Sequence, residues 1–331
     1  MGVIGAGHAA GQLHLPAFRR LPQLEIKSVF DIDRAKAEAL ASQLPGARVA
    51  AGADDIISDC GIDAVAILTP PGSHAVLLKR ALQAGKHVLV EKPLSCDGRE
   101  LDELVALAQA SKSVIAVGHN LRCHRLVRRA RAMIESGVLG AISGIRTVWS
   151  SPTRVRAGWN HEAGLEGSVL LDIAVHHVDL LAYLGSSRVS KVHATVVGGN
   201  RNSESASISG RLENGALFTS MVARRGPFEH NIHVSCTKGA IEFSCQKANA
   251  WRVIPELNLG MAAQASEMRQ YLAELPALVT AARTGGDWLE SYQVQWREFI
   301  SAVREGTRVP CTVAEAAEAA RVCIELSESA G

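Results

Sequence analysis

The sequence opens on Gly2-Val3-Ile4-Gly5-Ala6-Gly7-His8-Ala9-Ala10-Gly11, in which a short apolar run leads into a glycine-rich turn. The pattern Gly-x-Gly-x-x-Ala is typical of the turn between the first strand and the first helix of a dinucleotide-binding Rossmann domain. Gly5 allows the tight turn, Gly7 lets the backbone approach a pyrophosphate, and Ala10 is small enough for the helix to pack closely on the strand. The expected cofactor contacts in this turn are Gly5, Gly7, His8 and Ala9.

An acidic residue stands where such a domain places its ribose-binding carboxylate. Residues 24–30 are predicted to form a second strand, and Asp31 follows directly after them, about 20 residues beyond the glycine-rich turn. A carboxylate at this position accepts hydrogen bonds from the adenosine ribose and repels a 2′-phosphate, so we expect NAD in preference to NADP. The alternative is a phosphate site built from Arg34 and Lys36.

Helical and β-type stretches then alternate up to about residue 118, as a doubly wound parallel sheet requires. One predicted strand, over residues 64–68, ends in Thr69-Pro70-Pro71-Gly72-Ser73-His74. Rigid turns at the carboxyl ends of parallel strands commonly line a cofactor, although a plain strand-to-helix turn explains this loop equally well. The predicted cofactor contacts in this loop are Thr69, Pro70 and His74.

The next predicted strand brings a lysine to the same edge of the sheet, in the stretch His87-Val88-Leu89-Val90-Glu91-Lys92-Pro93. The ligand crevice of an open parallel sheet lies just beyond the carboxyl ends of its strands. We therefore expect Glu91 and Lys92 to face the cofactor, with Pro93 stiffening the exit from the strand. For Lys92 taken alone, a surface lysine at a strand end is the more common explanation.

The pattern changes from about residue 118. Five β-type runs, joined in part by the turn signals Asn214-Gly215 and Lys238-Gly239, predict an antiparallel sheet, and three helical stretches finish the chain. We expect an α/β Rossmann domain over residues 1–118, followed by an α+β substrate-binding and oligomerisation domain with a largely antiparallel open sheet over residues 119–331. The apolar run 216–222 suggests that a second subunit covers one face of this sheet, giving a homo-oligomer, either a dimer or a tetramer.

A mostly apolar stretch of helical length, residues 168–181, carries three polar groups on one face. Asp172, His176 and Asp179 are spaced by four and three residues. Buried ionisable groups are costly unless they are paired or functional, and we favour the functional explanation over a self-satisfied pair in the core. His177 lies about 100° away around the helix and is assigned to packing. With Lys92, these residues supply a general base, an orienting carboxylate and a cation, as proton removal during hydride transfer requires.

Composition limits the partners. The 331 residues suggest two domains, and 47% of them are hydrophobic, which is ample for two cores. A net charge of +2 with interspersed signs argues against nucleic acid or an anionic membrane. Seven scattered cysteines and no run of membrane-spanning length predict a soluble cytoplasmic protein with reduced thiols. His161, His176, His177 and the pair Cys123-His124 lack the spacing of a zinc site, so no metal is expected.

The chain resembles the family of glucose-fructose oxidoreductase, inositol dehydrogenase and rhizopine catabolism proteins (Gfo/Idh/MocA) over essentially its whole length. The resemblance rests on Gly5-Ala6-Gly7 with His14, Thr69-Pro70-Pro71 with His74, residues 84–93, Gly137-Val138-Leu139-Gly140, and Asp172-Ile173-Ala174-Val175-His176. It implies that Lys92 and His176 are catalytic, that Asp172 helps to hold the substrate, and that the Glu91-Lys92-Pro93 loop lies against the nicotinamide.

Substrate contacts follow from position alone. Asn120 and Arg122 come after the last predicted strand of the first domain, and Trp159-Asn160-His161 lie in the glycine-containing loop before the helix that carries His176. That loop is as compatible with a solvated lid as with recognition of sugar hydroxyls. The leading interpretation is a dehydrogenase that acts on a secondary alcohol or ketone of a sugar, cyclitol or related polyol. The alternatives are an NAD-dependent glycosidase that retains its cofactor and a non-catalytic nucleotide-binding paralogue.

Overall fold

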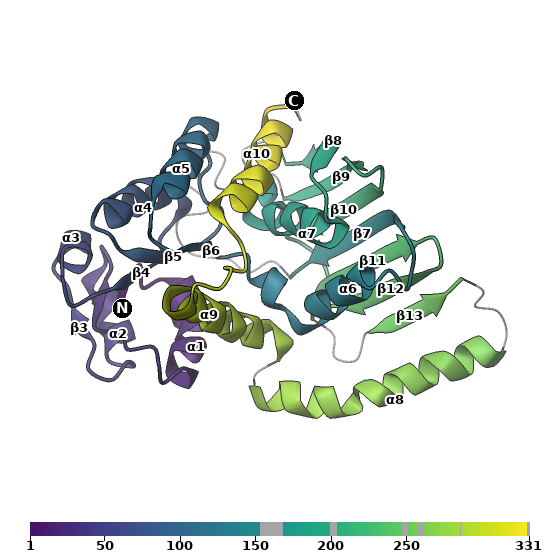
Figure 1. The fold of residues 1–331 in the computed structure, drawn as a ribbon, viewed down its shortest axis with the longest axis horizontal. Coiled ribbons are helices and arrows are strands. Elements are labelled where there is room, and N and C mark those ends of the chain that lie inside the picture. Colours follow the sequence, from purple (N-terminus) through teal and green to yellow (C-terminus); the bar gives the residue numbers. More distant parts are fainter. Residues whose placement is uncertain (153–167, 199–203, 247–250, 257–260, 285, 330–331) are drawn as a thin grey trace. The chain divides into compact units, whose positions relative to one another are not determined.

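The computed structural model describes the chain except for residues 153–167, 199–203, 247–250, 257–260, 285 and 330–331 (Figure 1). The chain divides into two compact units. The first unit comprises Met1–Cys123 and Ser291–Arg321, and the second comprises His124–Glu290 and Val322–Gly331. The chain passes from the first unit to the second after Cys123, five residues beyond the predicted boundary at residue 118. The sequence analysis did not predict that residues 291–321 belong to the first unit.

The described residues of the first unit form a six-stranded parallel sheet in the order β3-β2-β1-β4-β5-β6. This is the strand order of a Rossmann domain, as the sequence predicts. The strands are β1 (Gly2–Ile4), β2 (Ser28–Phe30), β3 (Arg48–Val49), β4 (Ala64–Ile67), β5 (His87–Val90) and β6 (Ile115–Val117). Its helices are α1 (Leu15–Arg20), α2 (Arg34–Ala41), α3 (Ala53–Ile57), α4 (His74–Gln83) and α5 (Gly98–Ala110).

The central strands of this sheet are buried on both faces, which explains their continuous apolar sequence. Val29, Val65 and Leu89 are fully buried. The turn after β1 requires glycine, because Gly5 has φ +98° and a Cβ there would lie 2.6 Å from the backbone of Leu68. After this turn the chain forms a π-helical turn, η1 (Ala9–His14), before α1 begins.

The described residues of the second unit form a seven-stranded mixed sheet in the order β13-β12-β11-β7-β10-β9-β8. Its strands are β7 (Ile142–Ser150), β8 (Val189–Val197), β9 (Ser205–Leu212), β10 (Leu217–Ala223), β11 (Glu229–Cys236), β12 (Gly239–Ser244) and β13 (Arg252–Pro255). The five predicted strands are present, and the sequence analysis missed β7 and β13. β7 is central, pairing parallel with β10 and antiparallel with β11, so the sheet is largely but not wholly antiparallel.

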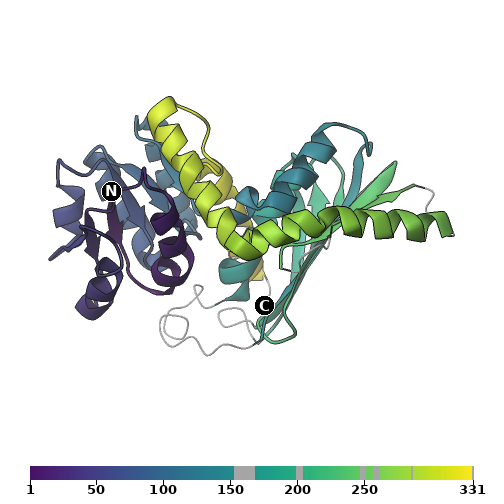
Figure 2. The ribbon, with the colours of Figure 1, turned by 90° about the horizontal axis from the view of Figure 1, so that it is seen from below.

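Two helices, α6 (Arg125–Glu135) and α7 (Val175–Gly185), contact strands of this sheet (Figure 1). Alternate residues of β10 show the two faces. Phe218 and Val222 are buried, whereas Leu217 and Met221 are 61% and 56% exposed. The long helix α8 (Met261–Thr284), labelled in Figure 1 and light green in Figure 2, contacts β13. The N–H of Val253 in β13 donates to Gln270 Oε1, and Gln270 Nε2 donates to the C=O of Val253.

The last two helices explain why residues 291–321 belong to the first unit. α9 (Asp287–Glu305) carries Trp296 and Phe299, which are both buried. The Trp296 ring lies 5.2 Å from that of Phe18, measured between centroids. α10 (Val313–Ser329) begins at a capping box, in which the N–H of Glu315 donates to Thr312 Oγ1 and the N–H of Thr312 donates to Glu315 Oε2.

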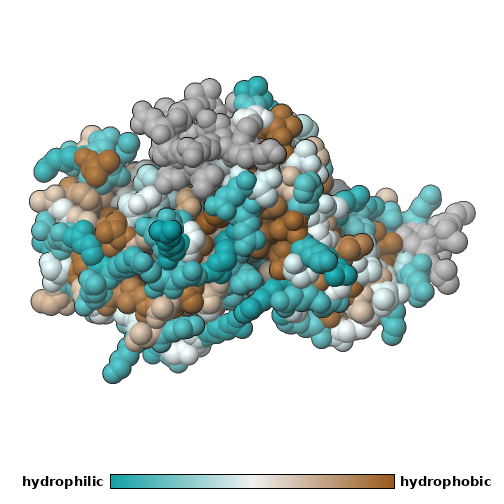
Figure 3. Space-filling model, turned by 90° about the horizontal axis from the view of Figure 1, so that it is seen from above, coloured by the Kyte–Doolittle hydropathy of each residue, from teal (hydrophilic) through white to brown (hydrophobic). Residues whose placement is uncertain are grey.

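Hydrophilic and hydrophobic residues are interspersed over the face seen in Figure 3. Within the described residues, no helix combines the length and the apolar character that crossing a membrane requires.

Candidate active site

The glycine-rich turn fits the approach of a dinucleotide. A Cβ placed on Gly7 would meet no atom within 4 Å, so the space beside its backbone is open. His8 is exposed and Ala9 is half-buried at the start of η1. The turn is held to its neighbours, because the N–H of Gly5 donates to the carbonyl of Phe30 at 2.8 Å. The backbone groups at the carboxyl end of β1 are thus fixed where a pyrophosphate would bind.

Asp31 follows β2 and stands beside this turn. One carboxylate oxygen accepts from the N–H of Ala6 at 2.7 Å, and the other accepts from the N–H of Asp33 at 2.9 Å. The cations of the alternative phosphate site already face acids: Arg34 pairs with Glu38, and Lys36 pairs with Asp33. The local charge arrangement therefore favours a ribose hydroxyl over a 2′-phosphate.

His74 joins the two loops that follow β4 and β5. Its ring is fully buried, with Nδ1 lying 2.8 Å from the carbonyl of Pro93 and Nε2 lying 2.8 Å from the carbonyl of Thr69. Burial lowers the pKa of His74, and the two carbonyl oxygens oppose that lowering. The side chain thus links the Thr69-Pro70 loop to the loop that carries Lys92.

Lys92 is half-buried and lies two residues beyond the end of β5. Its backbone N–H donates to Glu91 Oε2 at 3.2 Å. Glu91 itself is buried and turns inward, with Oε1 lying 3.0 Å from His14 Nε2. Of the pair expected to face the cofactor, Lys92 is thus partly open, whereas the Glu91 carboxylate supports the loop from within.

In the second unit, the predicted helix is present in two parts: a π-helical turn, η6 (Leu170–Ala174), followed by α7. Asp172 lies in the π-helical turn and is 7% exposed, and His176 is half-buried in the first turn of α7. Asp172 Oδ2 forms an ion pair with Arg224 Nη2 at 3.0 Å. Single π-helical turns occur often at functional sites.

His177 takes the packing role that its position on the helix predicts. It is 1% exposed, and Nδ1 lies 2.8 Å from Thr147 Oγ1 and 3.3 Å from Ser220 Oγ. Its ring is stacked on that of His230 with a centroid distance of 5.2 Å. Burial lowers the pKa of His177 to about 4. Of the two adjacent histidines, His176 is therefore the less buried.

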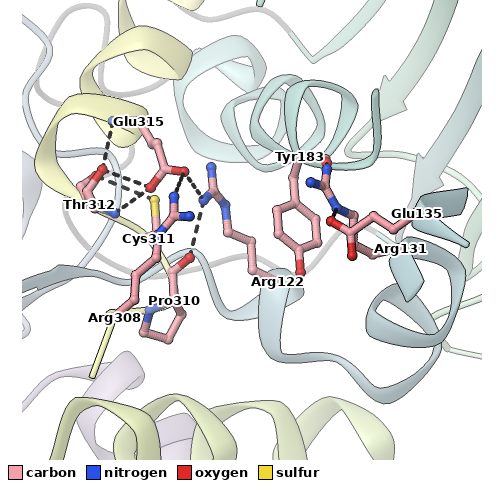
Figure 4. A network of polar contacts seen from close by, with 9 residues as sticks. All are labelled: Arg122, Arg131, Glu135, Tyr183, Arg308, Pro310, Cys311, Thr312 and Glu315. Atoms are coloured by element: carbon pink, nitrogen blue, oxygen red, sulfur yellow. Dashed lines mark hydrogen bonds and ion pairs between the residues drawn. The ribbon is translucent and has the colours of Figure 1, made fainter. Parts of the chain in front are cut away.

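Two of the residues expected to bind substrate, Asn120 and Arg122, are buried and contact other side chains of the first unit. Asn120 is buried and donates from Nδ2 to Ser291 Oγ at 2.9 Å. Arg122 is 4% exposed, and its Nη1 lies 2.9 Å from Glu315 Oε1 and 3.2 Å from the carbonyl of Pro310. Figure 4 shows its side chain directed toward these groups at the start of α10. Trp159, Asn160 and His161 lie outside the described residues.

Sequence reasoning missed Arg224. This residue follows β10 and reaches Asp172 across 52 positions of sequence. An arginine after a strand gives no local signal of its partner, because the sequence does not show which residues the tertiary fold brings beside it. The candidate residues thus fall into two groups, with Gly5, Gly7, Asp31 and Lys92 in the first unit and Asp172, His176 and Arg224 in the second.

Comparison with known proteins gives consistent results for both units. Residues 1–119 match a family model described as an oxidoreductase family with an NAD-binding Rossmann fold, and residues 127–242 match the GFO/IDH/MocA C-terminal domain. An inositol 2-dehydrogenase of Corynebacterium glutamicum strain R is 28% identical over 322 residues, which is 93% of this chain and 87% of that protein.

A UDP-N-acetylglucosamine 3-dehydrogenase of Acidithiobacillus ferrooxidans is 32% identical over 196 residues, covering 59% of this chain and 57% of that protein. Among solved structures, a levoglucosan dehydrogenase in complex with NADH and levoglucosan is similar with a TM-score of 0.82. That match is 24% identical and covers 99% of this chain and 96% of the other.

Proposed function

Since the chain belongs to the Gfo/Idh/MocA oxidoreductase family and carries its NAD-binding Rossmann domain, we propose that it is a dehydrogenase of sugars, cyclitols or related polyols. The reaction transfers a hydride between the nicotinamide cofactor and the carbon of a secondary alcohol or ketone. Relatives named as dehydrogenases of inositol and of UDP-N-acetylglucosamine support this substrate class.

One observation carries the proposal for catalysis. The half-buried His176 follows the buried Asp172 on one helix, in a chain that also places Lys92 just beyond the carboxyl end of β5. A histidine, a carboxylate and a lysine are the groups needed to move a proton on and off a hydroxyl while a hydride leaves the same carbon. The presence of all three groups counts against a chain that only binds nucleotide.

We assign His176 as the general base. An ordinary histidine has a pKa of about 6.5 and an ordinary lysine one of about 10.4, so histidine is better suited to accept a proton near neutral pH. Asp172, held by Arg224, orients His176 or binds a neighbouring substrate hydroxyl. Lys92 donates a hydrogen bond to the reacting oxygen as negative charge develops there. Bound NAD supplies the hydride acceptor. In the alternative assignment Lys92 is the base, its pKa lowered by burial and by the positive ring of NAD.

We also propose that the chain forms a homo-oligomer through the sheet of the second unit. Leu217 and Met221 are apolar and exposed on β10, and antiparallel sheets need only one covered face within a subunit. Light scattering at micromolar concentration checks this, and a monomeric mass would contradict it.

The decisive experiment incubates the protein with NAD and a panel of polyols, sugars and glycosides, and measures both NADH absorbance and sugar release. Accumulation of NADH that His176→Ala abolishes supports the dehydrogenase. Cleavage of a glycoside without net NADH would instead favour the glycosidase that retains its cofactor. NAD binding without turnover of any compound, at wild-type stability, would count against an enzyme of this substrate class.

A further inference from the structure

Three hydrogen bonds link the side chain of Trp296 to the backbone of Lys92. Trp296 Nε1 lies 2.9 Å from His14 Nδ1, His14 Nε2 lies 3.0 Å from Glu91 Oε1, and the N–H of Lys92 donates to Glu91 Oε2 at 3.2 Å. All four residues belong to the first unit, although Trp296 comes from its returning segment. None of these contacts has been assigned a role in the function proposed above.

The indole selects the tautomer of the neutral imidazole. An indole nitrogen can only donate, so His14 Nδ1 must accept and cannot carry the proton in the neutral ring. The proton of neutral His14 is therefore on Nε2, where it is directed at Glu91. A neutral histidine between an obligate donor and a carboxylate is held in one tautomer, because the hydrogen bond at one ring nitrogen determines whether the other nitrogen carries the proton.

The Glu91 carboxylate sits in a space that fits it closely. His14 and Trp296 are fully buried and the Glu91 side chain is 10% exposed. A Cβ added to Gly118, which follows β6, would lie 2.6 Å from Glu91 Oε1, so only glycine at this position leaves room for the carboxylate. Burial raises the pKa of Glu91, but the contacts with His14 and Lys92 outweigh it and the net shift is downward. A buried carboxylate of this kind depends on its donors.

We propose that His14 is a positioning residue for Lys92: acting through Glu91, and locked in its Nε2–H tautomer by Trp296, it fixes the peptide that carries the lysine. The importance of this position for catalysis rests on the proposed function. The hydrogen bonds themselves can be tested without any substrate. His14 touches no reacting atom in this arrangement, and its effect is transmitted through the two oxygens of one carboxylate.

Two substitutions of His14 separate its two contacts. In His14→Gln the side-chain amide nitrogen takes approximately the place of Nε2, so it can still donate to Glu91. In His14→Asn the shorter amide reaches only the place of Nδ1, so it can accept from Trp296 but leaves Glu91 without a side-chain donor. Both variants are neutral, and both remove the ring from the same aromatic cluster, which makes each the control for the other.

The first readout is hydrogen exchange of the Lys92 amide in the protein without ligand, with the Val65 amide of β4 as the internal reference. In His14→Asn we expect Lys92 to exchange roughly 10- to 100-fold faster relative to Val65, as the loss of a hydrogen bond to a charged group predicts, whereas His14→Gln stays close to the wild type. Equal exchange of Lys92 in the two variants, or an equal acceleration at Val65, would overturn the proposal.

The second readout is ¹⁵N NMR of histidine-labelled protein, with the His14 signals identified by their loss in His14→Gln. We expect a nitrogen without a proton at Nδ1 and a protonated nitrogen at Nε2, and a smaller share of this tautomer in Trp296→Phe. A proton on Nδ1 in the wild type would refute the tautomer. Once a substrate is found, His14→Asn should lower kcat by up to about 10²-fold, as small misplacements of a reacting group do, with NAD affinity nearly unchanged. Normal kcat in His14→Asn despite faster Lys92 exchange would reject the positioning role while leaving the dehydrogenase intact.

Discussion

Removing the charge of Glu315 should destabilise the first unit in a pH-dependent way. Burial raises the pKa of Glu315, but the guanidinium of Arg122 and the groups of Thr312 outweigh burial and lower the pKa from 4.5 to about 2. A lowering of this size corresponds to about 3 kcal/mol of unfolding free energy. Because the Glu315 side chain is 30% exposed, solvent screening reduces the expected contribution to about 2 kcal/mol.

The sign follows from proton linkage. The folded protein holds Glu315 ionised more strongly than the unfolded chain does, so the stabilisation is fully present above pH 4.5 and is lost as the pH falls toward about 2. Glu315→Gln should therefore lower the unfolding free energy by about 2 kcal/mol at neutral pH, with a difference from the wild type that shrinks through that window. Urea unfolding followed by circular dichroism at several pH values measures this.

Arg122 supplies the matched control. Arg122→Met should be destabilising at neutral pH, and the double variant should lose less than the sum of the single losses, because the two side chains contact each other. A loss in Glu315→Gln that is the same at all pH values would refute the electrostatic reasoning. An Arg122→Met variant of wild-type stability with a raised KM for substrate would instead support the sequence-based prediction that Arg122 binds substrate.

Three further outcomes are expected. His176→Ala should lower kcat by roughly 10²- to 10⁴-fold, which is the usual contribution of a positioned base. It should also remove the acidic limb of the pH profile of kcat, while the NAD affinity measured by fluorescence titration stays nearly constant. Full turnover in His176→Ala together with loss of turnover in His177→Ala would reverse the assignment. The pKa of His177 is about 4 in the folded protein and 6.5 ordinarily, so the unfolded chain binds the proton at a higher pH than the folded protein does. The unfolding free energy measured with urea should therefore fall as the pH is lowered from 6.5 to 4. His177→Asn should make this fall shallower, and an equally steep fall in the variant would contradict the prediction. Asp31→Ser should weaken NAD binding more than NADP binding in parallel titrations of the ligand-free protein, and tighter NADP binding by the wild type would contradict the role given to Asp31.

The Rossmann sheet could be predicted because its signals are local. Gly5 is needed where the chain must turn at positive φ, and each buried strand appears as an apolar run. The central strand β7 escaped prediction because its sequence, Ile-Ser-Gly-Ile-Arg-Thr-Val-Trp-Ser, breaks the alternation of apolar residues with Gly144 and Arg146. Strand pairing rather than composition makes it central, since it lies between β10 and β11.

The candidate site shows the same division between local and long-range information. Helical spacing predicts that His176 and His177 face different directions, and in the structure His177 is buried whereas His176 is half-buried. The catalytic role of His176 stays a prediction. The partners of the charged residues could not be predicted. Arg224 reaches Asp172, and Glu315 reaches Arg122, through the packing of segments far apart in sequence. A basic or acidic residue in a loop gives no sign of which opposite charge it will meet.

The return of residues 291–321 to the first unit affects how the protein can fold on the ribosome. The glycine-rich turn and all six strands of the first sheet are synthesised early, but Trp296 and Phe299, which complete the aromatic cluster around Phe18, are made only after the whole of residues 124–290. At about 5–20 residues per second, this interval lasts roughly ten to thirty seconds. During that time the nascent first unit has an uncovered apolar surface, and His14 lacks its indole donor. Ribosome-bound chains that stop before Ser291 should therefore be cut by protease within residues 1–123, whereas chains long enough to expose α9 should resist.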